Sequence, residues 1–259
     1  MATPRPDNLT LVAEAKDLSV SFAGRRVLKE INLQLRDRRL TVIIGPSGSG
    51  KTTLLRTFNR LNECFPYAAT SGSLRLRLGG EWQDIYRNSF PFTEIRRRIG
   101  MVFQTPNLLP MSIEKNIALP LQLVLGTPRS EIPRRLEEAL KSAQLWDEVK
   151  DRLRSPALTL SGGQQQRLCL SRALALEPDF LLLDEPTASL DFRAAGKIET
   201  LLTHLKERYP ILAVSHSLSQ ARRLADQVLV MRDGAIVRTL ERDEIAHPDL
   251  LPRLMEEIF

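Results

Sequence analysis

The chain has 259 residues, of which 42% are hydrophobic and 26% are charged. A chain of this length and composition can bury a substantial core, so disordered, collagen-like and fibrous proteins are excluded. Its 37 Lys and Arg residues outnumber its 31 Asp and Glu residues, and the resulting formal charge of +6 permits contact with nucleic acid or anionic lipid without indicating either.

The sequence carries no signal for a membrane-spanning helix or for export. No apolar run reaches the roughly 20 residues that a membrane-spanning helix requires, and Met1–Asn8 lacks the apolar stretch of a secretory signal. The two cysteines, Cys64 and Cys169, are too few for a disulfide framework or a zinc site. We therefore expect a cytosolic location, and we expect both cysteines to be ordinary packing residues.

The first third of the chain predicts strands. Leu18–Phe22 and Ile31–Leu35 alternate apolar and polar residues around a turn, which indicates an antiparallel pair. Leu40–Ile44 is an almost continuous apolar run, the pattern of a parallel strand buried on both faces. Leu74–Leu78 alternates again, and we interpret its arginine face as a solvated sheet edge.

The rest of the chain alternates helices and strands. Apolar residues at 136, 139, 140 and 143 share one helical face within Pro128–Ala143. Phe180–Leu183 and Ile211–Val214 are predicted as buried strands joined by a helix with apolar residues at 198, 201, 202 and 205, a βαβ unit. Smaller strands over 228–231 and 235–240 precede a helix near Pro248 and Pro252. The fold class is α/β.

A phosphate-binding loop follows the strand Leu40–Ile44. It matches G-x-x-x-x-G-K-[ST] in full and precedes a helix predicted over 53–61. The glycines let successive backbone N–H groups point at a polyphosphate, and the helix N-terminus favours the same anion; a structural Gly/Ser-rich turn is the alternative. Lys51 is expected to reach the β- and γ-phosphates, and Thr52 to ligate Mg²⁺. The predicted nucleotide-binding residues of this segment are Gly45, Pro46, Ser47, Gly48, Ser49, Gly50, Lys51, Thr52 and Thr53.

Two carboxylates end the strand Phe180–Leu183. Asp184 is expected to hold Mg²⁺ through water, because ligands of parallel sheets gather at the carboxyl edge. Glu185 lies one residue further, where it can orient or deprotonate an attacking water. A solvated strand end is the alternative, but the complete phosphate loop favours hydrolysis.

The order of the motifs carries a family resemblance. The phosphate loop is followed by Gln104 after the strand Ile99–Phe103, by Leu160–Gln164 (LSGGQ) ahead of a helix over 165–176, by Asp184 and Glu185, and by Asp191 and His216. This arrangement resembles an ABC-type ATPase over nearly the whole chain. The resemblance implies a P-loop core with a mixed sheet, an antiparallel β subdomain and an inserted α-helical subdomain. The implied boundaries are residues 9–259 for one ABC ATPase domain, 9–104 and 155–245 for the core and β subdomain, and 105–160 for the helical subdomain.

The resemblance also implies the roles of individual residues. Ser161, Gly162, Gly163 and Gln164 are expected to act on ATP bound by a second chain, so that two chains enclose two ATP molecules. Gln104 would sense Mg²⁺ and the attacking water, and His216 would contact the γ-phosphate of its own site. Asp191 would couple the two sites. Phe22 would stack on adenine, with a role in the strand core as the alternative.

A narrower similarity points to the ATP-binding subunit of bacterial phosphate importers. It is carried by five segments, of which the one around Trp146 is the most specific: Asn59–Asn62, Asp84–Tyr86, Arg96–Gln104, Leu145–Leu153 and Ser161–Cys169. The segment Ser217–Phe259 departs from that subfamily in its shortened, Arg-rich ending. ATP-driven import of inorganic phosphate is therefore expected, with import of another solute as the alternative.

The implied partners follow from the family. We expect a homodimer peripheral to the cytoplasmic face of the membrane, docked on two permease subunits and served indirectly by a solute-binding protein. Pro106–Pro120 is apolar and suits docking, with internal packing as the alternative. A soluble ATPase acting on nucleic acid is a second reading, which the charge would suit, but the chain has neither a heptad pattern nor a repeat. We expect no nucleic-acid partner. A regulator without turnover is disfavoured by Glu185 and LSGGQ.

Overall fold

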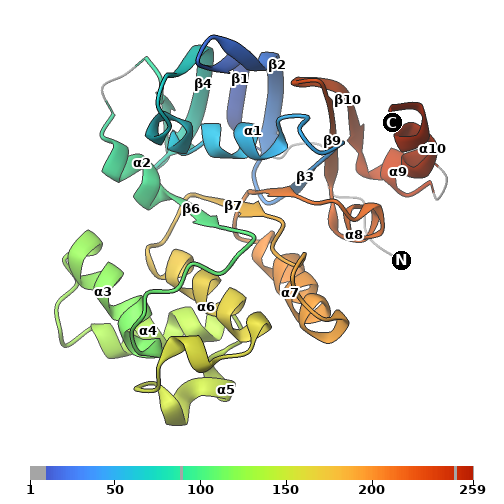
Figure 1. Cartoon of the computed structure of the whole chain (residues 1–259). Helices are drawn as coiled ribbons and strands as arrows, with labels where there is room; N and C mark the ends of the chain where they lie inside the picture. Colours follow the sequence, from blue (N-terminus) through green and yellow to red (C-terminus); the bar gives the residue numbers. More distant parts are fainter. Residues whose placement is uncertain (1–9, 88–89, 248–249, 259) are drawn as a thin grey trace.

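Residues 10–87, 90–247 and 250–258 are described by a computed structural model (Figure 1). The expected absence of a signal in Met1–Asn8 and the placement of Pro248 lie outside these residues. Two β-sheets and a separate group of helices make up the molecule (Figure 1).

The larger sheet has six strands in the order β10-β9-β3-β8-β7-β6, with β10 antiparallel and the others parallel. Every residue of β3, β7 and β8 is buried, which confirms the interpretation of these continuous apolar runs. The carboxyl ends of β3 and β7 therefore open at the same edge of the sheet. The strands are β3 (Leu40–Ile44), β6 (Ile99–Val102), β7 (Phe180–Asp184), β8 (Ile211–Val214), β9 (Gln227–Arg232) and β10 (Ala235–Glu241).

The smaller sheet is antiparallel, with the order β2-β1-β4-β5. Its strands are β1 (Leu11–Phe22), β2 (Arg25–Arg36), β4 (Ala68–Leu78) and β5 (Glu81–Asp84). The alternation in β4 is confirmed, because Arg75 and Arg77 are exposed while Leu74, Leu76 and Leu78 are buried. However, β4 pairs with both β1 and β5, so the interpretation of this strand as a sheet edge is wrong.

Helices cover the sheets and form the separate group. Those near the sheets are α1 (Lys51–Thr57), η1 (Leu61–Cys64), α2 (Phe92–Arg98), α6 (Gly162–Ala175), α7 (Phe192–Leu205), α8 (Leu218–Leu224), α9 (Arg242–Ile245) and α10 (Leu250–Ile258). The separate group is α3 (Ile113–Leu125), α4 (Ile132–Ser142), α5 (Trp146–Val149), η2 (Lys150–Arg152) and η3 (Ala157–Thr159). It has its own apolar cluster, to which Ile117 of α3, Leu140 of α4 and Leu168 of α6 belong.

A second apolar cluster joins the two sheets through α1. Leu54 and Leu55 of α1 are fully buried beside Leu18 of β1, Ile43 of β3 and Leu182 of β7. This packing fixes the start of α1 directly at the carboxyl end of β3. Burial of each such side chain contributes about 1.5–3 kcal/mol, so the position of the phosphate loop is set by the core beneath it.

Several predicted boundaries differ from the structure. α1 begins at Lys51 and ends at Thr57, not at residue 61, and Arg60 takes a left-handed conformation with φ 55°. The helix predicted to begin at Gln165 begins at Gly162, because Ser161 caps it. Cys169 is buried as expected, but Cys64 is exposed, so its interpretation as a packing residue is wrong.

Candidate functional site

The loop Gly45–Gly50 connects β3 to α1, and the backbone at Gly45 and Gly50 has conformations that favour glycine. Gly45 has φ 150°, and a Cβ atom there would lie 2.2 Å from the carbonyl oxygen of Met231. Gly50 caps α1 with φ 100°, and no side chain caps the first turn of that helix. The first N–H groups of α1 therefore have no side-chain acceptor, as an anion-binding helix N-terminus requires.

Lys51 points into the same loop. Its Nζ donates to the carbonyl oxygens of Gly45 at 2.9 Å and Pro46 at 2.7 Å. Burial lowers the pKa of the Lys51 ammonium, and the carboxylates of Glu185 and Asp184 partly oppose that shift. A buried cation beside the uncapped start of a helix is complementary to a polyphosphate.

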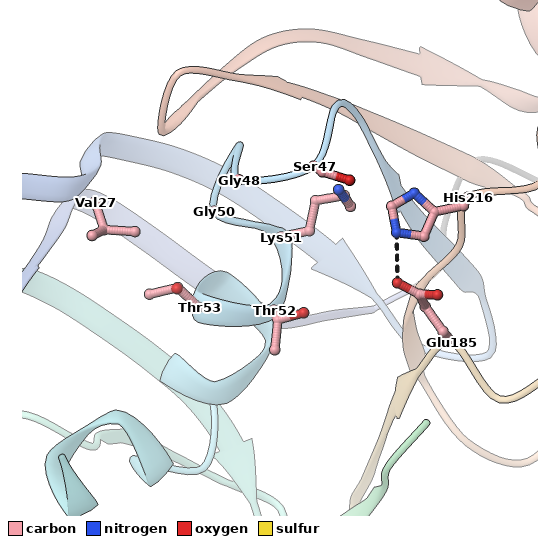
Figure 2. Close-up of a pocket in the computed structure, with 9 residues that line it drawn as sticks. All are labelled: Val27, Ser47, Gly48, Gly50, Lys51, Thr52, Thr53, Glu185 and His216. Carbon is pink, nitrogen blue, oxygen red and sulfur yellow. Dashed lines mark ion pairs between the residues drawn. The ribbon is translucent and has the colours of Figure 1, made fainter. Parts of the chain in front are cut away.

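A cavity of about 330 Å³ opens above the loop (Figure 2). It brings together residues from four places in the sequence: β2, the loop with the start of α1, the end of β7, and the segment after β8. Its lining residues are Val27, Ser47, Gly48, Gly50, Lys51, Thr52, Thr53, Glu185 and His216. All except Val27 are predicted from the sequence; Val27 belongs to no motif, and its backbone packs closely against Gly50 and Gly234.

Thr52 and Asp184 form the candidate metal site. Thr52 Oγ1 donates to Asp184 Oδ1 at 3.1 Å, and burial raises the pKa of the Asp184 carboxyl. Ser49 Oγ nearby in the loop is buried and without a hydrogen-bond partner. No cluster of three or more His, Cys, Asp or Glu side chains suited to a metal occurs within the described ranges. A hydroxyl and a buried carboxylate fit Mg²⁺, which prefers few protein oxygens together with substrate oxygens.

Glu185 and His216 lie side by side in the cavity lining and point toward each other (Figure 2). His216 Nε2 lies 2.6 Å from Glu185 Oε1. The side chain of Glu185 is 14% exposed, and its backbone has φ 48°, a left-handed conformation that costs a non-glycine residue about 1–3 kcal/mol. The surrounding sheet imposes this conformation, since the Glu185 N–H donates to Val214 O at 3.2 Å. The strain directs a carboxylate into the cavity.

Gly45, Pro46, Ser49 and Asp184 belong to the same loop or strand end as lining residues but do not line the cavity themselves. Gln104, Phe22 and Asp191 also lie outside the lining. Gln104 is exposed just after β6. Phe22 is half-buried at the end of β1 and meets Phe65 edge-to-face, with ring centroids 6.0 Å apart. Asp191 caps α7 by accepting from Ala194 N at 2.9 Å. Their predicted roles toward ATP stay predictions.

The LSGGQ segment is also outside the cavity of its own chain. Ser161 Oγ accepts from Gln164 N at 3.4 Å, and Gln164 Oε1 accepts from Ser161 N at 3.1 Å, which is a complete capping box. Gly162 and Gly163 occupy the first turn of α6, and a Cβ atom on Gly163 would lie 2.7 Å from Ala194 Cβ. Ser161 and Gly162 are exposed at this end of α6, whereas Gly163 is buried against α7.

The phosphate loop, the paired strand-end carboxylates and the six-stranded sheet define a P-loop nucleotide-binding protein. A family model described as "ABC transporter" matches residues 28–188, which is more than half of the chain. The chain belongs to the ABC transporter family. No described helix is long and apolar enough to cross a membrane.

The chain resembles several curated relatives along most of its length. It is 47% identical to a protein named Phosphate import ATP-binding protein PstB from Pyrobaculum aerophilum, covering 89% of this chain and 91% of the relative. It is 43% identical to Phosphate import ATP-binding protein PstB 2 from Bacillus licheniformis, with 90% and 84% covered.

Solved structures share the fold. cbiO1 from Clostridium perfringens, described as part of the ABC transporter complex cbiONQ, matches with a TM-score of 0.79 and 26% identity over 95% of each chain. A dimeric, post-hydrolysis form of the ATP-binding cassette MJ0796 with ADP and Pi matches with a TM-score of 0.73 and 30% identity, over 89% of this chain and 98% of that one. The predicted ABC ATPase fold class is confirmed.

Proposed function

We propose that the chain is an ATPase that powers the import of inorganic phosphate as a subunit of a membrane transporter. The observation that carries the proposal is the cavity that combines the phosphate loop, Thr52 beside Asp184, and Glu185 beside His216. The names of the relatives supply the solute, since both are phosphate import proteins.

The residues divide the work of hydrolysis between binding and proton transfer. The loop N–H groups and Lys51 bind the phosphates. Thr52 and Asp184 would hold Mg²⁺, and the bound ion would neutralise charge on the phosphate oxygens. A Glu185 carboxylate oxygen accepts a proton from the attacking water as the water oxygen bonds to the γ-phosphorus and the bond to the ADP oxygen breaks. His216 orients Glu185 and contacts the γ-phosphate, while Gln104 senses the metal and the water.

The other half of the site comes from a second copy of the chain. Ser161 and Gly162 are exposed at the N-terminus of α6, with Gly163 buried beside them, and this end of α6 suits the γ-phosphate of ATP held by another subunit. Gln164 belongs to the same turn, Asp191 couples the two sites, and Phe22 stacks on adenine. The proposed active form is a homodimer that encloses two ATP molecules.

The membrane subunits are proposed to dock on the helical group. A groove of about 600 Å³ runs between α3 and α4 and is mainly apolar, with Ala118, Ile132, Leu136 and Trp146 in its lining. Its α3 side belongs to the predicted docking segment 106–120, although Ile113 and Ile117 of that segment are buried in the helical cluster. The proposed occupant is a cytoplasmic helix of the two permeases, which places the chain at the cytoplasmic face of the membrane with a solute-binding protein outside.

Replacement of Glu185 by Gln tests the chemistry. We expect Glu185→Gln to lower ATP turnover by at least about 10²–10⁴-fold, because the proton acceptor is lost, while ATP is retained and the dimer accumulates. Phosphate release assays and gel filtration with ATP and magnesium measure both effects. Glu177→Gln is the matched control, since Glu177 has the same left-handed backbone (φ 51°) and an ion pair with Arg135 but lies outside the cavity lining.

The solute is tested with the transporter reconstituted from the genes adjacent to this one. Phosphate-loaded binding protein is expected to stimulate ATP turnover, whereas the unloaded protein is not. Parent-like turnover of Glu185→Gln would exclude the proposed proton acceptor, and stimulation by a different loaded solute would exclude phosphate.

A further inference from the structure

Glu148 of α5 lies outside the cavity and joins three helices at the end of α6 that carries Ser161–Gln164. Its Oε2 accepts from Gln164 Nε2 at 2.8 Å and from Arg167 at 2.9 Å. Its Oε1 accepts from Arg167 at 3.0 Å and from Lys197 Nζ of α7 at 3.0 Å. Each carboxylate oxygen of Glu148 thus accepts two hydrogen bonds from donors on α6 and α7. A carboxylate can do this because each of its oxygens has two lone pairs.

The contact with Gln164 fixes the capping box. An amide side chain has a donor and an acceptor end, and the donor end of Gln164 is held by Glu148. The acceptor end must then face the Ser161 N–H, which it does at 3.1 Å. The N–H groups of Gly162 and Gly163 have no intrahelical acceptor, since they belong to the first turn. Glu148 therefore helps to decide which N–H groups of α6 stay available to an anion.

The contacts with Arg167 and Lys197 fix the direction of the helix. The Arg167 side chain is only 5% exposed, and its guanidinium also donates to the carbonyl oxygen of Gln144. Lys197 ties the same carboxylate to α7, beside the close approach of Gly163 to Ala194. Hydrogen bonds from Arg167, Gln164 and Lys197 lower the pKa of Glu148 to about 2, so the carboxylate is charged at neutral pH.

We propose that Glu148 is a positioning residue that holds the N-terminus of α6 in the orientation needed to grip ATP bound by a second copy of the chain. The inference rests on the shared site of the proposed function. An N–H group stabilises an anion only within a narrow range of distance and angle, so a small tilt of α6 weakens the grip. Glu148 does not line the cavity of its own chain, so binding of ATP to one subunit is independent of it.

The experiment uses the full chain with Glu185→Gln, in which ATP is retained. Adding Glu148→Gln replaces two acceptor oxygens by one oxygen and one amide nitrogen, which opposes the donors of Gln164, Arg167 and Lys197. We expect the ATP-dependent dimer dissociation constant, measured by sedimentation, to rise by about tenfold or more. The affinity of the monomer for a fluorescent ATP analogue is expected to change by less than about twofold, a split that general destabilisation would not give.

Asp147→Asn is the matched control. Asp147 is the neighbouring carboxylate on α5, pairs with Lys150 at 3.1 Å, and has an 88% exposed side chain. It is expected to leave both constants unchanged. Lys197→Met removes only the contact with α7 and is expected to raise the dimer dissociation constant by about threefold. Because the Lys197 side chain is 58% exposed, this variant tests the inference even if Glu148→Gln does not fold.

The outcomes separate the inference from the proposed function. If Glu185→Gln alone does not form a dimer with ATP, the shared site is wrong and the role of Glu148 falls with it. If that dimer forms but Glu148→Gln leaves its dissociation constant unchanged, the inference alone is wrong. The same conclusion follows from an unchanged constant in Lys197→Met if Glu148→Gln does not fold. It is equally overturned if monomer affinity falls in parallel, or if Asp147→Asn has the same effect.

Discussion

Two helices of this molecule begin with glycine-rich segments, and their surroundings differ. The first turn of α1 has no side-chain cap and faces a cavity of its own chain, above the buried Lys51. The first turn of α6 is capped by Ser161 and Gln164, and its first residues, Ser161 and Gly162, are exposed. The N-terminus of α1 can therefore bind a nucleotide within its own chain, whereas the N-terminus of α6 can contact only a nucleotide that is bound by another molecule.

Lys51→Ala removes the cation of the first helix end and has the largest expected effect on nucleotide binding. We expect ATP affinity to fall by at least about 10²-fold, because a buried charge paired with phosphate is lost. Titration with a fluorescent ATP analogue measures the change. Lys206→Ala is the control, since Lys206 is similarly enclosed but pairs with Asp226 away from the cavity; an equal loss there would assign the effect to the fold.

Ser161→Arg blocks the second helix end and is expected to act one step later. A long cation over the first turn of α6 obstructs a partner's nucleotide, so dimer formation and turnover fall by about 10–10²-fold while ATP affinity of the monomer stays the same. Gel filtration and phosphate release measure the two effects. Ser112→Arg, at the capped start of α3, is the control.

Mixing two defective chains sharpens this test. Ser161→Arg chains keep an intact phosphate loop, and Lys51→Ala chains keep an intact α6 end. A mixed dimer has one complete site, so partial recovery of turnover is expected on mixing. Full turnover in homogeneous Ser161→Arg protein would contradict the shared arrangement.

Most of the sheet and the cavity follow from local sequence signals, whereas several boundaries do not. The apolar runs of β3, β7 and β8 predict buried strands directly, because strands that are covered on both faces need continuous apolar residues. α1 ends early because the chain turns into a left-handed conformation at Arg60, whose guanidinium stacks over Phe92 at 4.1 Å. That contact joins residues far apart in sequence, so no local pattern predicts the boundary.

The site shows the same division. Lys51, Thr52, Asp184 and Glu185 are predictable because each motif fixes its own geometry at the edge of the sheet. Val27 is not, since it reaches the cavity through tertiary contacts of its backbone with Gly50 and Gly234. The contacts of Glu148 are also invisible in the sequence, because α5, α6 and α7 meet only through tertiary packing.

The stability of the two regions is expected to depend on pH in opposite ways, because the pKa of Glu148 is lowered and the pKa of Asp184 is raised. The pKa of Glu148 is lowered to about 2 by its donors, so its contribution to stability is complete above its usual value of 4.5 and is lost as the pH falls toward about 2. The pKa of Asp184 is raised by burial, so its ionised form costs stability, and that cost appears as the pH rises through the raised value.

The opposite pKa shifts of Glu148 and Asp184 give the smallest of the expected effects, which is on the free energy of unfolding. At neutral pH, Glu148→Gln is expected to lower the free energy of unfolding by about 1–2 kcal/mol, allowing for solvent screening, whereas Asp184→Asn leaves it equal or higher. Urea titrations followed by tryptophan fluorescence at pH 7 and pH 4 measure both variants. The gap between them is expected to narrow at pH 4, because protonation begins to remove both the benefit at Glu148 and the cost at Asp184. If the difference in unfolding free energy between the two variants is independent of pH, the two carboxylates affect stability through packing and not through charge. The contrast between the two helix ends would then have no electrostatic part.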